Sequence, residues 1–211
     1  MKKLKISTLI VTCVFFVLTL SSCKYKYLLD PLIEVNEKFP ENLTSGKSIA
    51  EYARNIVEQD YGEEFEIGSL DMTLDSELKG EGKVGLVEKG KKRPQIAYVK
   101  FDTKNNMLLN FYYYGYETKV YPGIIDFQNW KIDYEDAIEI SEEFYSETEG
   151  FQYDSVLIET NDSYRGEEGW EVWRVLFYDY QNEKRYYTHI DPYTGGVLDH
   201  EVGELYPFGK G

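Results

Sequence analysis

The stretch that most constrains the fold is Tyr186–Glu201, which reads YYTHIDPYTGGVLDHE. The stretch predicts two strands that are joined by a tight turn containing glycine. In that turn Asp191 can accept backbone hydrogen bonds and Gly195 can supply a positive φ, as in a β-hairpin. A weaker form of the pattern, VKFDTKNNMLLNF, occupies Val99–Phe111, with Asp102 in the place of Asp191. Two related hairpins in one chain predict a unit that is built twice.

A helix is predicted ahead of each hairpin. Apolar residues recur at helical spacing over Ser45–Glu58, and Asp133 is placed to cap a second helix that runs to Ser146. Strands follow each helix, which predicts an α+β fold of two units, each a helix packed on an antiparallel β-sheet. The predicted boundaries are 44–116 for the first unit, 117–131 for the connection and 132–203 for the second unit.

The first 22 residues have the features of a signal peptide. Lysines at the start precede an apolar run, Leu9–Leu20, that is too short to span a membrane comfortably. The run ends in LSSC, which resembles the lipobox of bacterial lipoproteins. The resemblance implies removal of residues 1–22, a lipid on Cys23, and a place on the extracytoplasmic face of the membrane of a bacterium, of the Gram-positive type.

The chain carries a large excess of acidic residues. Asp and Glu number 38 against 23 Lys and Arg, a formal net charge of −15. Such a surface repels nucleic acid, so no nucleic-acid partner is expected. One of the two cysteines, Cys13, lies in the segment predicted to be removed, so no internal disulfide is expected. Residues 23–43 are predicted to be a tether from the lipid, and residues 204–211 a short tail.

The second half of the chain resembles the PepSY domain family over about Asp133–Glu201. The first half resembles it only loosely, with Asn106 in the place of Gly195. The resemblance implies two PepSY-like units in a non-catalytic module of envelope proteins, without catalytic residues and with a role in restraining peptidases. The matching residues are Ala137, Trp170, Glu171, Val172, Ile190, Asp191, Thr194, Gly195, Val197 and Leu198.

Asp191, Thr194 and Gly195 are the residues that first suggest a site. Turn geometry explains all three, because one carboxylate and one hydroxyl fall short of the six or more oxygens that Ca²⁺ prefers. The only histidines, His189 and His200, lie on the two arms of the same hairpin and are weak candidates for a zinc or copper site. We otherwise expect no metal and no cofactor.

Three functions follow from these observations. The first is a non-catalytic lipoprotein that binds a protein partner, with restraint of a secreted peptidase as one version. The second is an envelope sensor or scavenger of a small ligand or metal. The third is an envelope hydrolase, for which adjacent acids such as Glu142-Glu143 lack the separation that paired catalytic carboxylates need. The chain also lacks the common motifs of nucleophilic and metal-dependent hydrolases, so we expect no enzyme.

Overall fold

The computed structural model describes residues 32–40, 43, 45–92, 94–115, 124–160 and 171–205. By its contacts the chain divides into Met1–Asp30 and Pro31–Gly211, and every described residue belongs to the second unit. The described strands are β1 (Ile33–Lys38), β2 (Phe65–Asp75), β3 (Gly80–Glu88), β4 (Gln95–Asp102), β5 (Met107–Gly115), β6 (Ser155–Thr160), β7 (Trp173–Asp179), β8 (Lys184–Ile190) and β9 (Val197–Glu204). The described helices are α2 (Gly46–Tyr61) and α3 (Tyr134–Tyr145).

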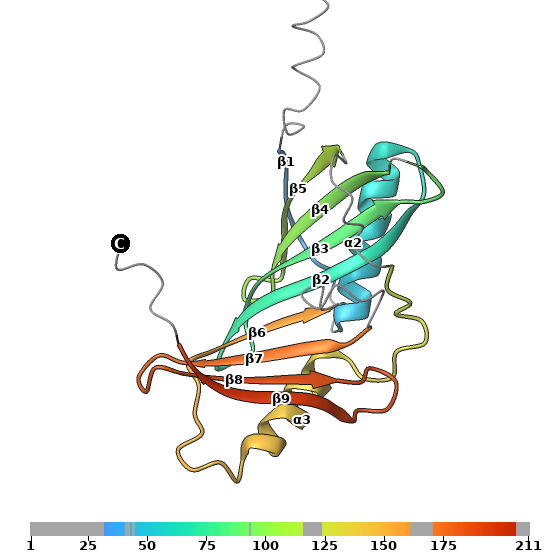
Figure 1. Ribbon diagram of the computed structural model, residues 1–211. Helices are drawn as coiled ribbons and strands as arrows, with labels where there is room; N and C mark the ends of the chain where they lie inside the picture. Colours follow the sequence, from blue (N-terminus) through green and yellow to red (C-terminus); the bar gives the residue numbers. More distant parts are fainter. Residues whose placement is uncertain are drawn as a thin grey trace, which may run out of the picture. The chain divides into compact units, whose positions relative to one another are not determined.

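All nine strands form a single antiparallel sheet, in the order β1-β5-β4-β3-β2-β6-β7-β8-β9 (Figure 1). The pairing of β2 with β6, from Asp71↔Glu159 to Asp75↔Ser155, makes the sheet continuous. The prediction of two α+β units is therefore wrong. The fold is mostly β, because strands from the two halves of the chain share one hydrogen-bonded ladder.

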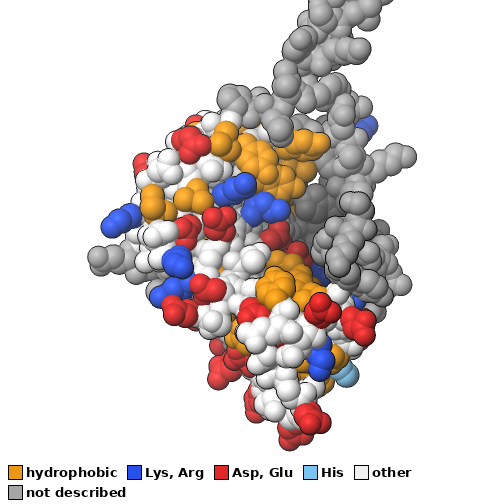
Figure 2. All heavy atoms as spheres, turned by 90° about the vertical axis from the view of Figure 1, so that its left-hand side faces the viewer, with side chains coloured by type: hydrophobic (Ala, Val, Ile, Leu, Met, Phe, Trp, Pro, Cys, Tyr) orange, Lys and Arg blue, Asp and Glu red, His pale blue; other side chains and the backbone are white. Residues whose placement is uncertain are grey.

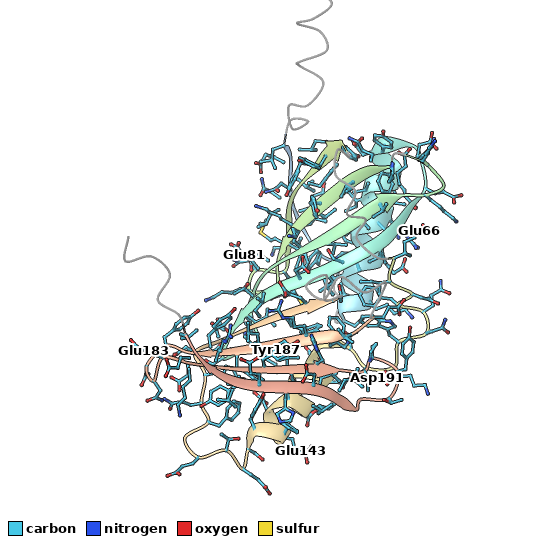
Figure 3. All side chains as sticks on the ribbon, viewed as in Figure 1. Glu66, Glu81, Glu143, Glu183, Tyr187 and Asp191 are labelled. Carbon is cyan, nitrogen blue, oxygen red and sulfur yellow. The ribbon has the colours of Figure 1, made fainter. Side chains whose placement is uncertain are left out.

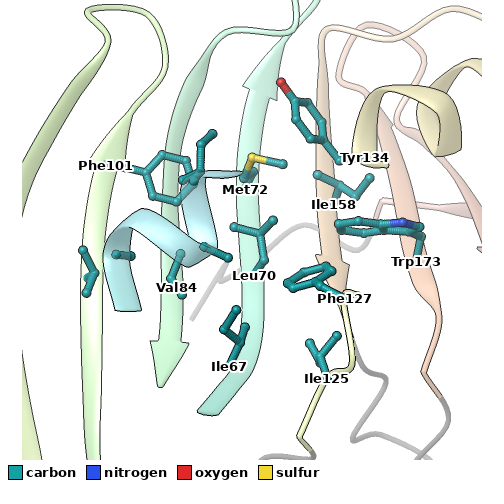
Figure 4. Close-up of a cluster of buried hydrophobic side chains, with 14 of the residues drawn as sticks. Ile67, Leu70, Met72, Val84, Phe101, Ile125, Phe127, Tyr134, Ile158 and Trp173 are labelled. Atoms are coloured by element: carbon teal, nitrogen blue, oxygen red, sulfur yellow. The ribbon is translucent and has the colours of Figure 1, made fainter. Parts of the chain in front are cut away.

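The core is likewise continuous across the two halves (Figure 4). Leu70 and Met72 of β2 belong to the same buried cluster as Ile158 of β6 and Trp173 of β7. Ile125 and Phe127 also belong to this cluster, although they lie in the segment 117–131 that was predicted to be only a connection. Burial of apolar side chains from both halves in one cluster is the main stabilising term for the whole sheet.

The two helices begin at one shared carboxylate. Ser45 caps α2 in a reciprocal arrangement with Ser48, and Asp133 caps α3. Asp133 Oδ1 accepts hydrogen bonds from the backbone N–H of Tyr134 at 2.6 Å and from that of Gly46 at 3.0 Å. A carboxylate at two helix N-termini is favoured by both helix dipoles. Glycine at position 46 leaves room for this contact, since an added Cβ would lie 2.9 Å from Asp133 Oδ1 and 2.8 Å from Leu70 Cδ2.

The predicted tether, residues 23–43, contains part of the folded structure. β1 pairs with β5 between Ile33↔Phe111 and Lys38↔Met107. Phe39 belongs to the core and is only 9% exposed. Residues 33–39 are therefore part of the sheet and its core, and only the residues before them can act as a tether. Of the two described helices, neither is long and apolar enough to cross a bilayer.

Candidate functional site

A groove of about 760 Å³ lies between α3 and the turns β2–β3 and β4–β5. We call it the acidic groove. Its apolar lining comes from α2, α3, the segment that follows β1 and the β2–β3 turn, namely from Phe39, Leu43, Ile49, Leu78, Tyr134 and Ile138. Its charged lining is Glu77, Lys79, Glu135, Asp136, Glu139 and Glu142.

One face of α3 forms the acidic wall of the groove. Glu135, Ile138, Glu139 and Glu142 have the spacing i, i+3, i+4, i+7 and therefore lie along one helical stripe. The side chain of Ile138 is fully buried at the base of this stripe. Asp136 caps the helix, since its Oδ2 accepts a hydrogen bond from the backbone N–H of Asp133.

Two tyrosines hold carboxylates of this wall. Tyr134 Oη donates to Glu135 Oε1 at 3.0 Å, and Tyr153 Oη donates to Glu142 Oε1. Burial raises the pKa of both phenols well above the usual range, and the adjacent carboxylates raise it further. Both phenols therefore stay protonated and remain donors. Glu139 is exposed and has no hydrogen bond or ion pair with any described residue.

The opposite wall is the turn between β2 and β3. Asp75 Oδ1 accepts from the backbone N–H of Glu77 at 2.9 Å and from that of Lys79 at 3.1 Å, which fixes the turn. Leu78 between them has φ +57°, a left-handed conformation that is uncommon for a residue with a side chain. The turn thus holds a leucine in a strained conformation at the groove.

The groove has a strongly negative charge balance. Five of its lining residues are acids and one is a lysine, Lys79, whose Nζ lies 3.9 Å from Glu77 Oε2. On the face drawn in Figure 2, by contrast, acidic and basic side chains lie close together. An apolar floor beneath an excess of carboxylates can accept a ligand that carries both positive charge and apolar groups.

The hairpin residues predicted as a site serve the turn between β8 and β9 (Figure 3). Asp191 Oδ1 accepts from the backbone N–H of Tyr193 at 2.8 Å, and Asp191 Oδ2 accepts from Thr194 Oγ1 at 2.7 Å. Gly195 has φ +76°. All three residues lie outside the acidic groove.

The two histidines lie on opposite faces of the hairpin. His189 pairs with Asp199, and His200 pairs with Thr188, one position along the strand. His189 is 1% exposed beside Tyr187, whereas His200 is exposed with its ring 4.7 Å from that of Phe144. They cannot bind one ion together. The described residues contain no group of three potential ligands from His, Cys, Asp and Glu.

The sequence reasoning missed most of the acidic groove. Glu142 was considered only as a hydrolase acid, and the other acids were not singled out. The spacing of Glu135, Glu139 and Glu142 could have indicated an acidic helix face. No sequence pattern could have placed Glu77 in the groove, because only the fold brings it opposite α3. Cys23 lies outside the described residues.

Comparison with known proteins reveals a shared fold. No protein-family model and no curated protein matches the chain, so the PepSY resemblance stays a prediction. Among solved structures, the predicted lipoprotein CD1622 of Clostridium difficile 630 matches with a TM-score of 0.53 at 14% identity. The match covers 80% of this chain and 99% of that chain. At this identity the likeness establishes the fold.

Proposed function

We propose that the protein is a lipid-anchored binding protein of the bacterial envelope that holds a basic segment of a partner protein in its acidic groove. The observation that carries the proposal is the groove itself, with five acids and one lysine around an apolar floor. We propose no catalysis, because the lining offers carboxylates, a lysine, a threonine, an asparagine and the phenol of Tyr134, which burial keeps protonated beside Glu135.

Charge and shape favour a protein segment over a simple cation. The groove is open, and its volume exceeds what a single ion needs. Leu43 and Leu78 line the groove with half-buried side chains. A bare cation would not use this apolar surface, whereas the aliphatic stems of lysine and arginine pack on such surfaces while their charged ends reach carboxylates. The negative field of the groove also accelerates encounter with a basic partner.

Reversal of one groove charge tests the binding site. We expect Glu139→Lys to weaken binding of an amphipathic Lys/Leu helical peptide at least ~10-fold at low salt, because it replaces an attraction by a repulsion. The matched control is Glu143→Lys, an exposed glutamate on the same helix that does not line the groove (Figure 3). Isothermal titration calorimetry measures both. If both variants weaken binding equally, the effect comes from the net charge of the protein, and the groove is not the binding site.

The lipid anchor is supported by the LSSC sequence at Cys23 and by a fold shared with a chain that is described as a predicted lipoprotein. We expect Cys23→Ser to abolish incorporation of labelled palmitate and to move the protein out of the membrane fraction. If the wild-type protein incorporates no labelled palmitate in the same host, the lipid anchor is wrong, whereas the proposal for the acidic groove is unaffected.

Restraint of a secreted peptidase is the narrower version of this function. It rests on the PepSY resemblance around Asp191, Thr194 and Gly195 alone. We expect the purified mature protein to slow at least one co-expressed secreted peptidase, and Glu139→Lys to relieve that inhibition. Full peptidase activity with wild-type protein in excess would remove the peptidase version.

A further inference from the structure

The outer edge of β9 combines features that point to a second docking surface. β9 is the last strand of the sheet, and none of the described strands pairs with its outer side. Two of its three large aliphatic residues are exposed, Leu198 at 52% and Val202 at 49%. Edge strands are normally protected by charges, proline or a covering element.

The register fixes which backbone groups point outward. Leu205 N donates to Glu183 O at 2.7 Å, so these two residues form a hydrogen-bonded pair of the ladder. The pairs Arg185↔Gly203 and Tyr187↔Glu201 lie two and four residues further along and are of the same kind. Hydrogen-bonded and non-hydrogen-bonded pairs alternate along an antiparallel ladder. The backbone N–H and C=O groups of His200 and Val202 therefore point away from β8. The N–H of His200 donates to Asp199 Oδ1 at 2.9 Å, a hydrogen bond that an added strand would replace.

The side chains of β9 differ between its two faces. On the α3 side, His200 and Val202 alternate along the strand, and Leu198 follows at the register shift beside Ile190. The His200 ring lies tilted at 4.7 Å from that of Phe144, which is 40% exposed. We call these four residues the edge strip. On the other face lie the carboxylates of Asp199 and Glu201. Glu201 Oε1 lies 3.5 Å from a guanidinium nitrogen of Arg185, and its side chain stays 64% exposed. One face of the edge is apolar and the other is acidic.

We propose that the β9 edge accepts an extended segment of a partner protein as a tenth strand, with apolar residues over the edge strip and alternating Lys or Arg opposite Asp199 and Glu201. Strand addition takes its affinity from main-chain hydrogen bonds and its specificity from alternate side chains. The site goes beyond the acidic groove, because none of the four edge-strip residues lines the groove.

A second copy of this chain suits the edge less well than a basic strand. Each copy has a formal net charge of −15, so two copies repel each other. An antiparallel pair centred on His200 would also place Asp199 opposite Glu201 of the other copy. Like charges directly opposite each other destabilise a sheet. A strand with alternating basic residues removes both penalties.

The probe for the test is the labelled peptide Ac-KVKVKVK-NH2, with fluorescence anisotropy on the mature wild-type chain. We expect saturable binding that Val202→Lys weakens at least ~10-fold, since the change removes apolar contact and adds repulsion. The matched control is Thr73→Lys, which adds the same charge at an exposed position on β2. We expect this control to stay within ~2-fold of wild type.

A second peptide separates strand addition from simple charge attraction. N-methylation of alternate residues removes the main-chain donors on one edge of the peptide without changing its charge. We expect binding to be lost when the methylated edge is the one that faces β9. Equal binding of both N-methylated isomers would overturn the proposal, as would loss of binding in Glu139→Lys but not in Val202→Lys. Dimerisation of the wild-type protein that Val202→Lys abolishes would also overturn it, in favour of a second copy.

Discussion

At the scale of single residues, the described part of the chain uses the same turn arrangement at four positions. Each turn follows the pattern Asp-x-x-Asn or Asp-x-x-Thr. The Asp Oδ1 accepts from the backbone N–H two residues on, and Oδ2 accepts from the side chain three residues on. The side chain takes the place of a backbone turn bond, which is why Asp and Asn dominate these positions. The four turns begin at Asp102, Asp126, Asp179 and Asp191.

The turn carboxylates make stability depend on pH. Burial opposes ionisation of Asp179, but hydrogen bonds from Asn182 outweigh it and hold the pKa below its ordinary value. A folded-state pKa below the unfolded value adds stability above that unfolded value and loses it as the pH falls. We therefore expect the melting temperature of wild type to drop between about pH 5 and pH 3.

Asp179→Asn removes this titrating group and keeps an acceptor. We expect its melting temperature to fall less steeply over the same pH range than that of wild type. Glu143→Gln is the matched control, since this exposed acid has no described side-chain partner. Thermal scans by circular dichroism provide the measurement. An unchanged slope in Asp179→Asn would contradict the role of its hydrogen bonds.

Two adjacent glycines in the β8–β9 turn allow a matched test. Gly195 has φ +76°, and an added Cβ would lie 3.2 Å from Ile140 Cδ1. For Gly196, which is not among the positive-φ residues, an added Cβ meets only Thr194 Oγ1 at 3.4 Å. We expect Gly195→Ala to lower the free energy of unfolding by about 1–2 kcal/mol, and Gly196→Ala by less. Urea denaturation measures both, and equal losses would mean that the left-handed conformation is not required.

At the scale of elements, α3 serves both the core and the groove. Its inner face is held to β8 by a buried hydrogen bond of 2.6 Å between Ser141 Oγ and Thr188 Oγ1, both fully buried. Tyr145 Oη also donates to Tyr187 O at 2.6 Å. These contacts fix the rotation of the helix about its axis. Glu135, Glu139 and Glu142 therefore face the groove.

The Ser141–Thr188 pair predicts non-additive mutant effects. We expect Thr188→Val to cost about 1–3 kcal/mol, because it leaves a buried Ser141 hydroxyl with one partner fewer. Adding Ser141→Ala should then cost less than Ser141→Ala costs in wild type, since the hydroxyl that lost its partner is gone. Denaturant unfolding of the two single variants and the double variant gives the coupling. Strict additivity would mean that the two hydroxyls do not stabilise each other.

Local signals explain which elements the sequence could predict. Both helices were predicted to within a few residues, because Ser45 and Asp133 carry capping signals beside apolar stripes. The β8–β9 hairpin was predicted from its turn residues. β1 was not, since its six residues include a register shift between Glu34 and Glu37 and a positive φ at Asn36. Its strand conformation depends on pairing with β5, which is far away in the sequence.

At the scale of the whole molecule, the seam between β2 and β6 explains why two units were predicted wrongly. No local sequence pattern predicts a pairing between strands that lie so far apart in the chain. The seam also places Asp71 directly opposite Glu159, two like charges. Each is compensated on its other side, Asp71 by Lys83 at 3.3 Å and Glu159 by Arg174 at 2.8 Å. Burial, and then the nearby Glu159, raise the pKa of Asp71 despite Lys83.

One continuous sheet predicts one cooperative unfolding transition. All three tryptophans, Trp130, Trp170 and Trp173, lie in the C-terminal half, so their fluorescence reports mainly that half, whereas far-UV circular dichroism reports the whole chain. In urea the two probes should have the same midpoint. Ile158 of β6 is fully buried at the seam, so Ile158→Ala should lower the free energy of unfolding by about 2–5 kcal/mol.

The seam variant decides between one cooperative unit and two. If β2–β6 pairing couples the halves, Ile158→Ala moves the fluorescence and circular dichroism midpoints down together, because neither half keeps its ladder when the other unfolds. The exposed variant Thr73→Ala, on the same stretch of β2, should leave both midpoints nearly unchanged. A fluorescence transition that precedes the circular dichroism transition, in wild type or in Ile158→Ala, would mean that the halves unfold separately despite their shared sheet.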